Sequence, residues 1–288
     1  MMLVRTHQLD DQQLSALDLL CAECKAVDGN LVATYRHLLS QDRPIPCNIL
    51  YYQKHKLIGF LRTFFFYTHI CEIAAMVAPH YRKRGIASKM LNDSLPLIIE
   101  QDIHTLVFSS PHQLNDAWLP TKGFTHQGSE YQMQYQNNAT LMVNDKSANV
   151  RIATQADIST LSAIDTACFP AKEVDMAQRF FSLLCDPNYT LFIVSQHGVP
   201  VGKAHLYWQP DGARLTDIAV IPRAQGRGLG STLITYCIQH AIKANKPNIV
   251  LDVETINQSA LNLYFRLGFI ITNAHDYWTI PLLKKISL

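Results

Sequence analysis

The sequence contains no apolar run of about 20 residues, the length that a membrane-spanning helix needs. It also lacks an excess of charge of one sign. It has 25 Lys and Arg and 23 Asp and Glu, and the formal net charge of +2 argues against a nucleic-acid binder. The N-terminal stretch MMLVRTHQLDDQQ has charges and glutamines where a signal peptide has an apolar core. We therefore expect a cytoplasmic protein without a membrane span, with secretion by another route left open.

Sequence motifs typical of metal ligands are missing as well. The 12 histidines show no HExxH or other ligand spacing, and the seven cysteines are scattered along the chain. Cys21 and Cys24 form a CxxC, but it lies in a helical pattern without a second CxxC or a histidine pair. We expect these thiols to be reduced and mostly packed in the core, and we expect no metal site.

What the sequence does contain is an internal repeat. Three blocks recur in the same order, with offsets of 147, 143 and 145 residues. The matched pairs are LSALDLLC (14–21) with LSAIDTAC (161–168), VAPHYRKRGIASKML (77–91) with VIPRAQGRGLGSTLI (220–234), and Lys122–Phe124 with Leu267–Phe269. A chain of 288 residues has room for two domains of about 140 residues. We predict an N-terminal domain over 1–137, a polar linker over 138–148 and a C-terminal domain over 149–288.

Each half shows the same order of expected elements. A short strand and one or two amphipathic helices come first, followed by three strands rich in β-branched and aromatic residues. A helix that begins at a glycine, an apolar strand, another helix and a last strand complete the half. Helices that pack on a mixed, mostly antiparallel sheet define an α+β (α/β) fold in each domain.

A glycine turn leads from a strand into the third helix in both halves. Small residues let the backbone approach a ligand closely, and the unpaired N–H groups at the start of the helix then bind phosphate or pyrophosphate. The turn matches neither GxxxxGK[ST] nor GxGxxG, so a nucleotide-triphosphate loop and a dinucleotide fingerprint are excluded. The predicted ligand-binding residues are Gln225, Gly226, Arg227, Gly228, Leu229, Gly230 and Ser231 in the second half, and Arg82, Lys83, Arg84, Gly85, Ile86, Ala87 and Ser88 in the first.

The turn, which follows a V-x-P strand end, resembles the acetyl-CoA loop of the GCN5-related N-acetyltransferases (GNAT). In the second half the resemblance extends to residues 257–269, which are similar to the family's NxxAxxLYxxxGF segment. The resemblance implies two tandem GNAT domains, and it covers nearly the whole chain. Tandem copies are also similar to mycothiol-synthase-like enzymes and to the VipF type of bacterial effector.

The resemblance implies acetyl-CoA as cofactor and assigns roles in the second half. Asn257 and the strand residues Ile218, Ala219 and Val220 are implied to contact the cofactor, as is Val77 in the first half. The oxyanion donor is implied to be a backbone amide near Ala219 or Val220.

Two further demands of acetyl transfer to an amine are met by side chains. Tyr264 is implied to protonate the departing thiolate. A base or a chain of waters should take the proton of the amine; the resemblance implies an acidic residue of the central strands, and the candidates are Asp217, Asp252 and Glu254, of which the first two lead.

The first half has lost these polar candidates. At the offsets of the repeat, Tyr264 aligns with Leu119, Asn257 with His112 and Asp217 with Ala74. Leucine cannot protonate a thiolate and alanine cannot accept a proton, so the N-terminal domain is predicted to be catalytically degenerate while keeping its phosphate-binding turn.

We therefore expect an N-acetyltransferase that acts on a primary amine at its C-terminal domain. The N-terminal domain would be structural, CoA-binding or substrate-docking. One alternative is a weakly catalytic or non-catalytic CoA-binding module that acts on a protein partner, and another is a catalytic first half that uses Glu72, Tyr81 or His112. The acceptor, small molecule or protein, and the oligomeric state stay open at this point.

Overall fold

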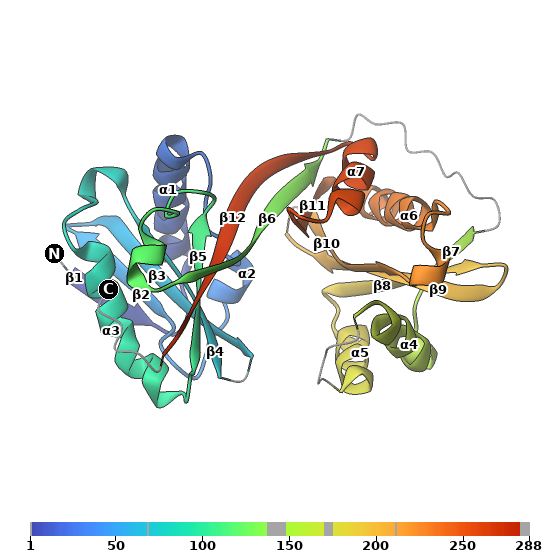
Figure 1. Cartoon of the computed structure of the whole chain (residues 1–288), viewed down its shortest axis with the longest axis horizontal. Helices are drawn as coiled ribbons and strands as arrows, with labels where there is room; N and C mark the ends of the chain where they lie inside the picture. The colour runs from blue at the N-terminus through green and yellow to red at the C-terminus, as the bar shows by residue number, and fades with distance from the viewer. Residues whose placement is uncertain (1, 68, 137–147, 170–174, 211, 283–288) are drawn as a thin grey trace. The chain divides into compact units, whose positions relative to one another are not determined.

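The computed structural model describes residues 2–67, 69–136, 148–169, 175–210 and 212–282, and it separates into two compact units (Figure 1). Unit 1 comprises Met1–Tyr131, Glu254–Ile256 and Asn273–Leu288, and unit 2 comprises Gln132–Val253 and Asn257–Thr272. Each unit therefore contains residues from both halves of the sequence. The predicted linker over 138–148 lies outside the described residues except for Ala148.

The first half of the chain folds into alternating strands and helices. Its elements are β1 (Met2–Thr6), α1 (Asp11–Asp28), α2 (Arg36–Leu39), β2 (Asn48–Gln53), β3 (Lys56–Tyr67), β4 (Ile70–Val77), a 3₁₀ turn (Pro79–Tyr81), α3 (Ile86–Glu100), β5 (Thr105–Pro111), a second 3₁₀ turn (Leu119–Lys122) and β6 (Thr125–Tyr135).

The second half repeats this order. Its elements are β7 (Ala148–Ile152), a 3₁₀ turn (Gln155–Asp157), α4 (Ile158–Cys168), α5 (Met176–Cys185), β8 (Tyr189–Gln196), β9 (Val199–Trp208), β10 (Gly212–Val220), a 3₁₀ turn (Pro222–Ala224), α6 (Leu229–Lys243), β11 (Asn248–Glu254), α7 (Gln258–Arg266) and β12 (Phe269–Pro281).

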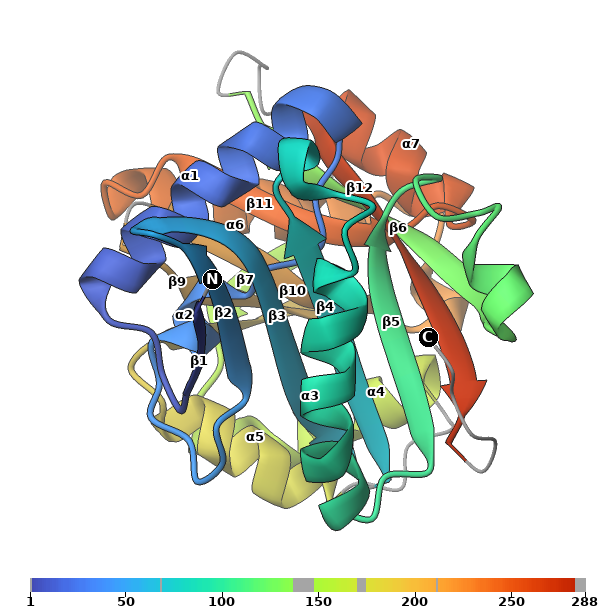
Figure 2. The ribbon, with the colours of Figure 1, turned by 90° about the vertical axis from the view of Figure 1, so that its left-hand side faces the viewer.

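Unit 1 is built on a sheet with the strand order β1-β2-β3-β4-β5-β12-β6. Neighbouring strands from β1 to β4 are antiparallel, β4 and β5 are parallel, and β5 and β12 are antiparallel. Helices α1 and α3 both pack on β3 and β4, and Figure 2 shows α3 lying across the face of these strands. This arrangement confirms the predicted mixed, mostly antiparallel sheet flanked by helices.

Unit 2 has the order β6-β11-β10-β9-β8-β7, in which β10 and β11 are the parallel pair. This pairing runs from Gly212 opposite Asn248 to Leu215 opposite Leu251, although β10 continues to Val220 and β11 to Glu254. The two strands thus separate beyond Leu215. In unit 1, β4 and β5 separate in the same way after the pair Ala74–Ser109.

One predicted element is wrong. The first half was expected to form a helix between its fifth and last strands, but the structure has only the 3₁₀ turn Leu119–Lys122 there. Gln113 adopts the left-handed conformation (φ 61°), which a helix does not propagate through. Pro120 has no N–H to donate to the carbonyl of Asp116, so a helix cannot extend across it. In the matching segment of the second half, Phe265 stands in place of Pro120, and Gln258, which aligns with Gln113, begins α7.

Strand β12 connects the end of the chain to unit 1. Residues His275–Pro281 pair with β5 in reverse order, from Pro111 back to Thr105. Trp278 and Ile280 are buried in the same hydrophobic cluster as Phe108 and Phe124 of the first half. The last strand of the second repeat is therefore part of the core of unit 1.

We predict that Trp278→Ala destabilises unit 1 by about 3–5 kcal/mol, because it leaves a cavity in that core. Ile271→Ala, an exposed position on the same strand, is the matched control and should cost less than about 0.5 kcal/mol. Urea denaturation followed by circular dichroism measures both. Equal stabilities of the two variants would show that β12 does not stabilise unit 1 in solution.

Candidate active site

The glycine turn of unit 2 opens helix α6 without a side-chain cap. Gly226 and Gly228 have φ angles of 75° and 80°, which glycine adopts without strain. Gly228 is the N-cap of α6, and its missing side chain leaves the first N–H groups of the helix without an intrahelical or capping partner. A Cβ atom built at either glycine would meet nothing within 4 Å. The turn therefore presents backbone N–H groups to open space, as an anion site requires.

This turn lines a cleft of about 740 Å³ in unit 2. Of the predicted residues, the cleft is lined by Ile218, Val220, Gln225, Gly226, Gly228, Leu229, Gly230, Ser231, Asn257 and Tyr264. Ala219 and Arg227 are not among its lining residues. The structure thus brings together two segments that lie about 30 residues apart in the sequence, the glycine turn and helix α7.

The backbone of β10 faces the cleft at Val220. The N–H of Ile221 donates to the carbonyl of Val201 on β9 at 2.9 Å. Since successive N–H groups of a strand point to opposite sides, the Val220 N–H points away from β9, toward the gap left by β11. The Val220 carbonyl, on the same side, accepts a hydrogen bond from Gln225 Nε2 at 2.8 Å. Of the two predicted amides, Val220 therefore has the orientation that an oxyanion donor needs, and Ala219 does not.

Helix α7 places two predicted residues on the cleft. Asn257 is its N-cap, with a side-chain oxygen that accepts from the Ala260 N–H at 3.1 Å. Tyr264 is 7% exposed and packs edge-on against Phe269, with 5.9 Å between ring centroids. Burial raises the pKa of Tyr264 to about 12. Its hydroxyl has no hydrogen-bond partner among the described residues, so it is available to a ligand in the cleft.

Asp217 lies at a β-bulge in β10. The register with β9 shifts between Thr216 and Ala219, and Asp217 has a φ of 49°. Its carboxylate is bound by Arg179 of α5 and lies 3.4 Å from His205 Nδ1. Although burial alone raises the pKa of Asp217, the charges of Lys203, His205 and Arg179 outweigh it and hold the pKa below its usual value. Asp217 is thus a stable anion and a weak base.

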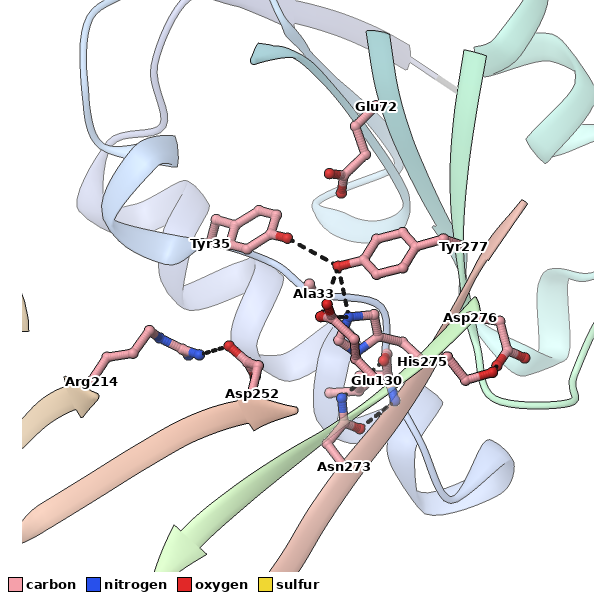
Figure 3. Close-up of polar contacts among 12 residues, drawn as sticks. Ala33, Tyr35, Glu72, Glu130, Arg214, Asp252, Asn273, His275, Asp276 and Tyr277 are labelled. Atoms are coloured by element: carbon pink, nitrogen blue, oxygen red, sulfur yellow. Dashed lines mark hydrogen bonds and ion pairs between the residues drawn. The ribbon is translucent and has the colours of Figure 1, made fainter. Parts of the chain in front are cut away.

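The other two candidate carboxylates lie outside the cleft lining. Asp252 on β11 is bound by Arg214 of β10 (Figure 3). Glu254 is exposed and makes no ion pair within the described part of the chain. The contacts of unit 2 do not place Asp252 beside Tyr264, and Glu254 belongs to unit 1.

Sequence reasoning missed a group of buried charges next to Asp217. Lys203 is fully buried, and its Nζ lies 2.9 Å from Asp165 Oδ1 of α4. His205 is 1% exposed, and its pKa is lowered to about 3. Burial is the larger cause, and the positive charge of Lys203 is the second. A signal was present in the sequence, because Lys203 and His205 interrupt an apolar strand at a spacing of two and must share one face of β9.

Unit 1 has a corresponding cleft of about 450 Å³ at its own glycine turn. Gly85, with a φ of 74°, is the uncapped N-cap of α3. The predicted residues on this cleft are Val77, Arg82, Lys83, Gly85, Ile86, Ala87 and Ser88. Arg82 is not a free cation, because its guanidinium is held by both oxygens of Asp28, at 2.7 and 2.6 Å, and also donates to the Val77 carbonyl. Arg84 does not line the cleft and lies against the ring of Tyr81.

The residues considered for a catalytic first half are all engaged in unit 1. Glu72 accepts from the buried Arg62 at 2.6 Å. His112 Nδ1 lies 2.7 Å from Asp276 Oδ1 of β12. Tyr81 lines the cleft.

No helix long and apolar enough to cross a membrane occurs among the described residues.

Comparison with known proteins identifies one family for both halves. The family model described as "Acetyltransferase (GNAT) family" matches residues 15–117 and 158–269. The chain is 30% identical over 214 residues to a mycothiol acetyltransferase of Mycobacteroides abscessus, which covers 68% of this chain and 70% of the relative. It is also 30% identical over 138 residues to the L-amino acid N-acyltransferase MnaT of Escherichia coli, which covers 43% of this chain and 80% of that protein.

Solved structures share the fold over the whole chain. A GCN5-related N-acetyltransferase from Sphaerobacter thermophilus has a TM-score of 0.76 at 14% identity, with 99% of this chain and 98% of that chain covered. A tandem GNAT protein from the clavulanic acid biosynthesis pathway has a TM-score of 0.67 at 15% identity, with 97% and 98% covered. Likeness to the VipF type stays a prediction.

The buried His205 predicts a pH dependence of stability. Its pKa is about 3 in the folded protein and near 6.5 in the unfolded chain, so only the unfolded chain takes up a proton between these values. Stability should be full above pH 6.5 and fall by about 1.4 kcal/mol per pH unit below it. Urea denaturation of the wild type and of His205→Gln between pH 7 and 5 should show a flatter slope for the variant. His55→Gln, at an exposed turn, is the control and should keep the wild-type slope; equal slopes for all three proteins would contradict the prediction.

Proposed function

Because the chain belongs to the acetyltransferase (GNAT) family, we propose that it transfers the acetyl group of acetyl-CoA to a primary amine in unit 2. The observation that carries this proposal is the cleft in which the glycine turn, the Val220 amide and the Tyr264 hydroxyl meet. The mycothiol acetyltransferase and the L-amino acid N-acyltransferase among its relatives support an amine acceptor. We leave the identity of that amine open.

The turn residues would hold the phosphates of acetyl-CoA. Gly226 and Gly228 keep the approach open, and the first N–H groups of α6 face the cleft with the positive end of the helix dipole. Asn257 and Ser231 add polar side chains to the lining. These donors fit a pyrophosphate, since they offer N–H groups without a nearby carboxylate in the cleft lining.

The reaction needs one bond to form and one to break. The amine nitrogen attacks the thioester carbonyl carbon, and the Val220 N–H stabilises the oxygen on which negative charge develops. The carbon–sulfur bond then breaks, and Tyr264 donates its proton to the departing thiolate. Before the attack the ammonium loses one proton to water, because Asp217 is too weak a base to keep it. The second proton leaves the nitrogen as the amide forms and returns through water to the Tyr264 phenolate.

Asp217 therefore has an electrostatic part in this proposal. It lies next to Ile218 on the strand that lines the cleft, and as a stable anion bound by Arg179 it would hold the bulge of β10 beside the cleft in place. Asp252 is the alternative for proton removal within unit 2; Glu254, the third candidate from the sequence, belongs to unit 1.

Unit 1 has an uncapped helix start and a cleft of its own, and we propose that it binds CoA. It has Leu119 where unit 2 has Tyr264, so it would not protonate a thiolate.

Tyr264→Phe tests the chemical role. Turnover should fall by about 10²-fold or more, the usual range for a lost general acid, with little change in acetyl-CoA affinity. Release of free thiol against a panel of amines, measured from pH 6 to 10, gives turnover, and calorimetry gives the affinity. Turnover equal to that of the wild type over the whole pH range would remove Tyr264 from the mechanism.

Gly228→Ala tests the phosphate site. A side chain at this φ is strained and enters the space above the first N–H groups of α6, so CoA affinity should fall by about 10-fold. Gly198→Ala is a matched control, because Gly198 has a φ of 77°, equally open surroundings and no place in the cleft. If calorimetry finds the same affinity for both variants, the turn of α6 does not hold the cofactor.

A further inference from the structure

Two histidines lie side by side at the start of the parallel ladder in unit 1. The ladder between β4 and β5 (Figure 2) begins with the pair Ile70–Thr105. His69 and His104 are the residues directly before this pair. The N–H groups of His104 and Thr105 both donate to the His69 carbonyl, at 2.8 and 3.0 Å. The pairing of the two strands therefore holds the two histidine backbones next to each other.

The side chains of these histidines meet one carboxylate. The imidazole rings of His69 and His104 are stacked, with 4.4 Å between centroids and 4° between planes. His69 Nδ1 lies 3.1 Å from one carboxylate oxygen of Asp102, and His104 Nε2 lies 3.2 Å from the other. Two imidazoles and a carboxylate thus come together, with one possible ligand atom from each within 4.8 Å of the others.

The backbone also fixes the position of Asp102. It lies in the turn between α3 and β5 and adopts the left-handed conformation, with a φ of 53°. Its carbonyl oxygen accepts a hydrogen bond from His69 Nδ1 at 2.8 Å. No short sequence motif contains this set, since 33 residues separate His69 from Asp102. The expectation of no metal site was based on local spacing, which cannot detect ligands brought together by strand pairing.

Unit 2 has the same turn with other residues in it. Its parallel ladder begins at Asn248 of β11, directly after Pro247, so proline takes the place of His104. Asn245 has a φ of 57° two residues after α6, as Asp102 does after α3. The left-handed turn is therefore common to both units, whereas the carboxylate and the second imidazole occur only in unit 1.

The donor set selects one class of metal ion. Imidazole nitrogens suit Zn²⁺ and neighbouring transition metals, whereas Mg²⁺ and Ca²⁺ take oxygen ligands. Three protein ligands with water in the fourth position are a usual zinc arrangement. Zn–N and Zn–O bonds are about 2.0–2.2 Å long, so the ligand atoms must move closer together and the stacked rings must tilt. Both rings have room to turn, because their side chains are 46% and 58% exposed.

We propose that His69, Asp102 and His104 bind a zinc ion on unit 1. The ion takes the place of the protons that now lie between the ring nitrogens and the carboxylate, and it joins the start of β4 to the turn after α3. The glycine turn of unit 1 follows the other end of β4, after Val77. The zinc site is therefore separate from both clefts and independent of the function proposed above.

Zn²⁺ itself is the probe, added to the untagged full chain at neutral pH. Calorimetry should find a zinc site whose affinity falls by about 10-fold or more in His69→Gln and in Asp102→Asn, since even an outer partner of a metal ligand is worth about 10–100-fold. Mg²⁺ should not bind there.

His197→Gln is the matched control. His197 is also exposed and left-handed (φ 50°), in the turn between β8 and β9, and it belongs to no group of metal-ligating side chains among the described residues. Its loss should leave the zinc affinity unchanged.

A second measurement links zinc to the folded chain. Zn²⁺ should raise the unfolding temperature of the wild type and of His197→Gln more than that of His69→Gln, because the three ligands are brought together only by folding. Circular dichroism checks that each variant is folded. Equal zinc affinity in the wild type, His69→Gln and Asp102→Asn, an equal loss in His197→Gln, or equal binding of Mg²⁺ and Zn²⁺ would each overturn the proposal, whatever the turnover of unit 2.

Discussion

The separation of two parallel strands is the constraint on which the rest of unit 2 depends. Beyond Leu215, β10 has no partner on the side of β11, and a strand with unpaired N–H groups must find other acceptors or a ligand. The gap is bounded by the glycine turn before α6 and by α7, so the cleft, the oriented Val220 amide and the buried Tyr264 all follow from it. A continuous ladder to Val220 would fill the place where the ligand is expected.

The bulge at Asp217 distinguishes the two units at this position. In unit 1 the register of β3 and β4 is regular from Gly59 to Phe64, and Ala74 takes the corresponding place. In unit 2 the extra residue turns a carboxylate toward Arg179, and the buried Lys203 keeps it ionised. Buried ions are stable only when they are paired, and the positive charges near Asp217 provide that pairing. The same pairing lowers the basicity of the Asp217 carboxylate. One inserted residue therefore changes both the backbone and the acid–base chemistry.

Much of the fold and the candidate site was predictable from local pattern. The order of the strands, expected from runs of β-branched and aromatic residues, the helix that begins at the glycine turn and the meeting of that turn with the 257–264 segment were all expected and are found. The missing helix before β6 and the ion pairs of Asp217 and Asp252 were not expected. The missing helix depends on Pro120 and on the left-handed conformation of Gln113, which Gln258 does not share. The ion pairs depend on arginines that are distant in sequence, which periodicity does not report.

The sequence by itself determined that the chain is a duplication, that both copies have a glycine turn before their third helix, and that only the second has Asn257 and Tyr264 on the helix after its fifth strand. These properties are local, since glycine conformation and helix capping involve a few neighbouring residues. Only the tertiary structure decided which carboxylates are bound by arginines, which amide faces the cleft, and that His275 and Tyr277 of the last strand belong to unit 1. Strand pairing between distant segments is chosen by the burial of Trp278 and Ile280 in a core made by other residues, and no short stretch of sequence contains that information.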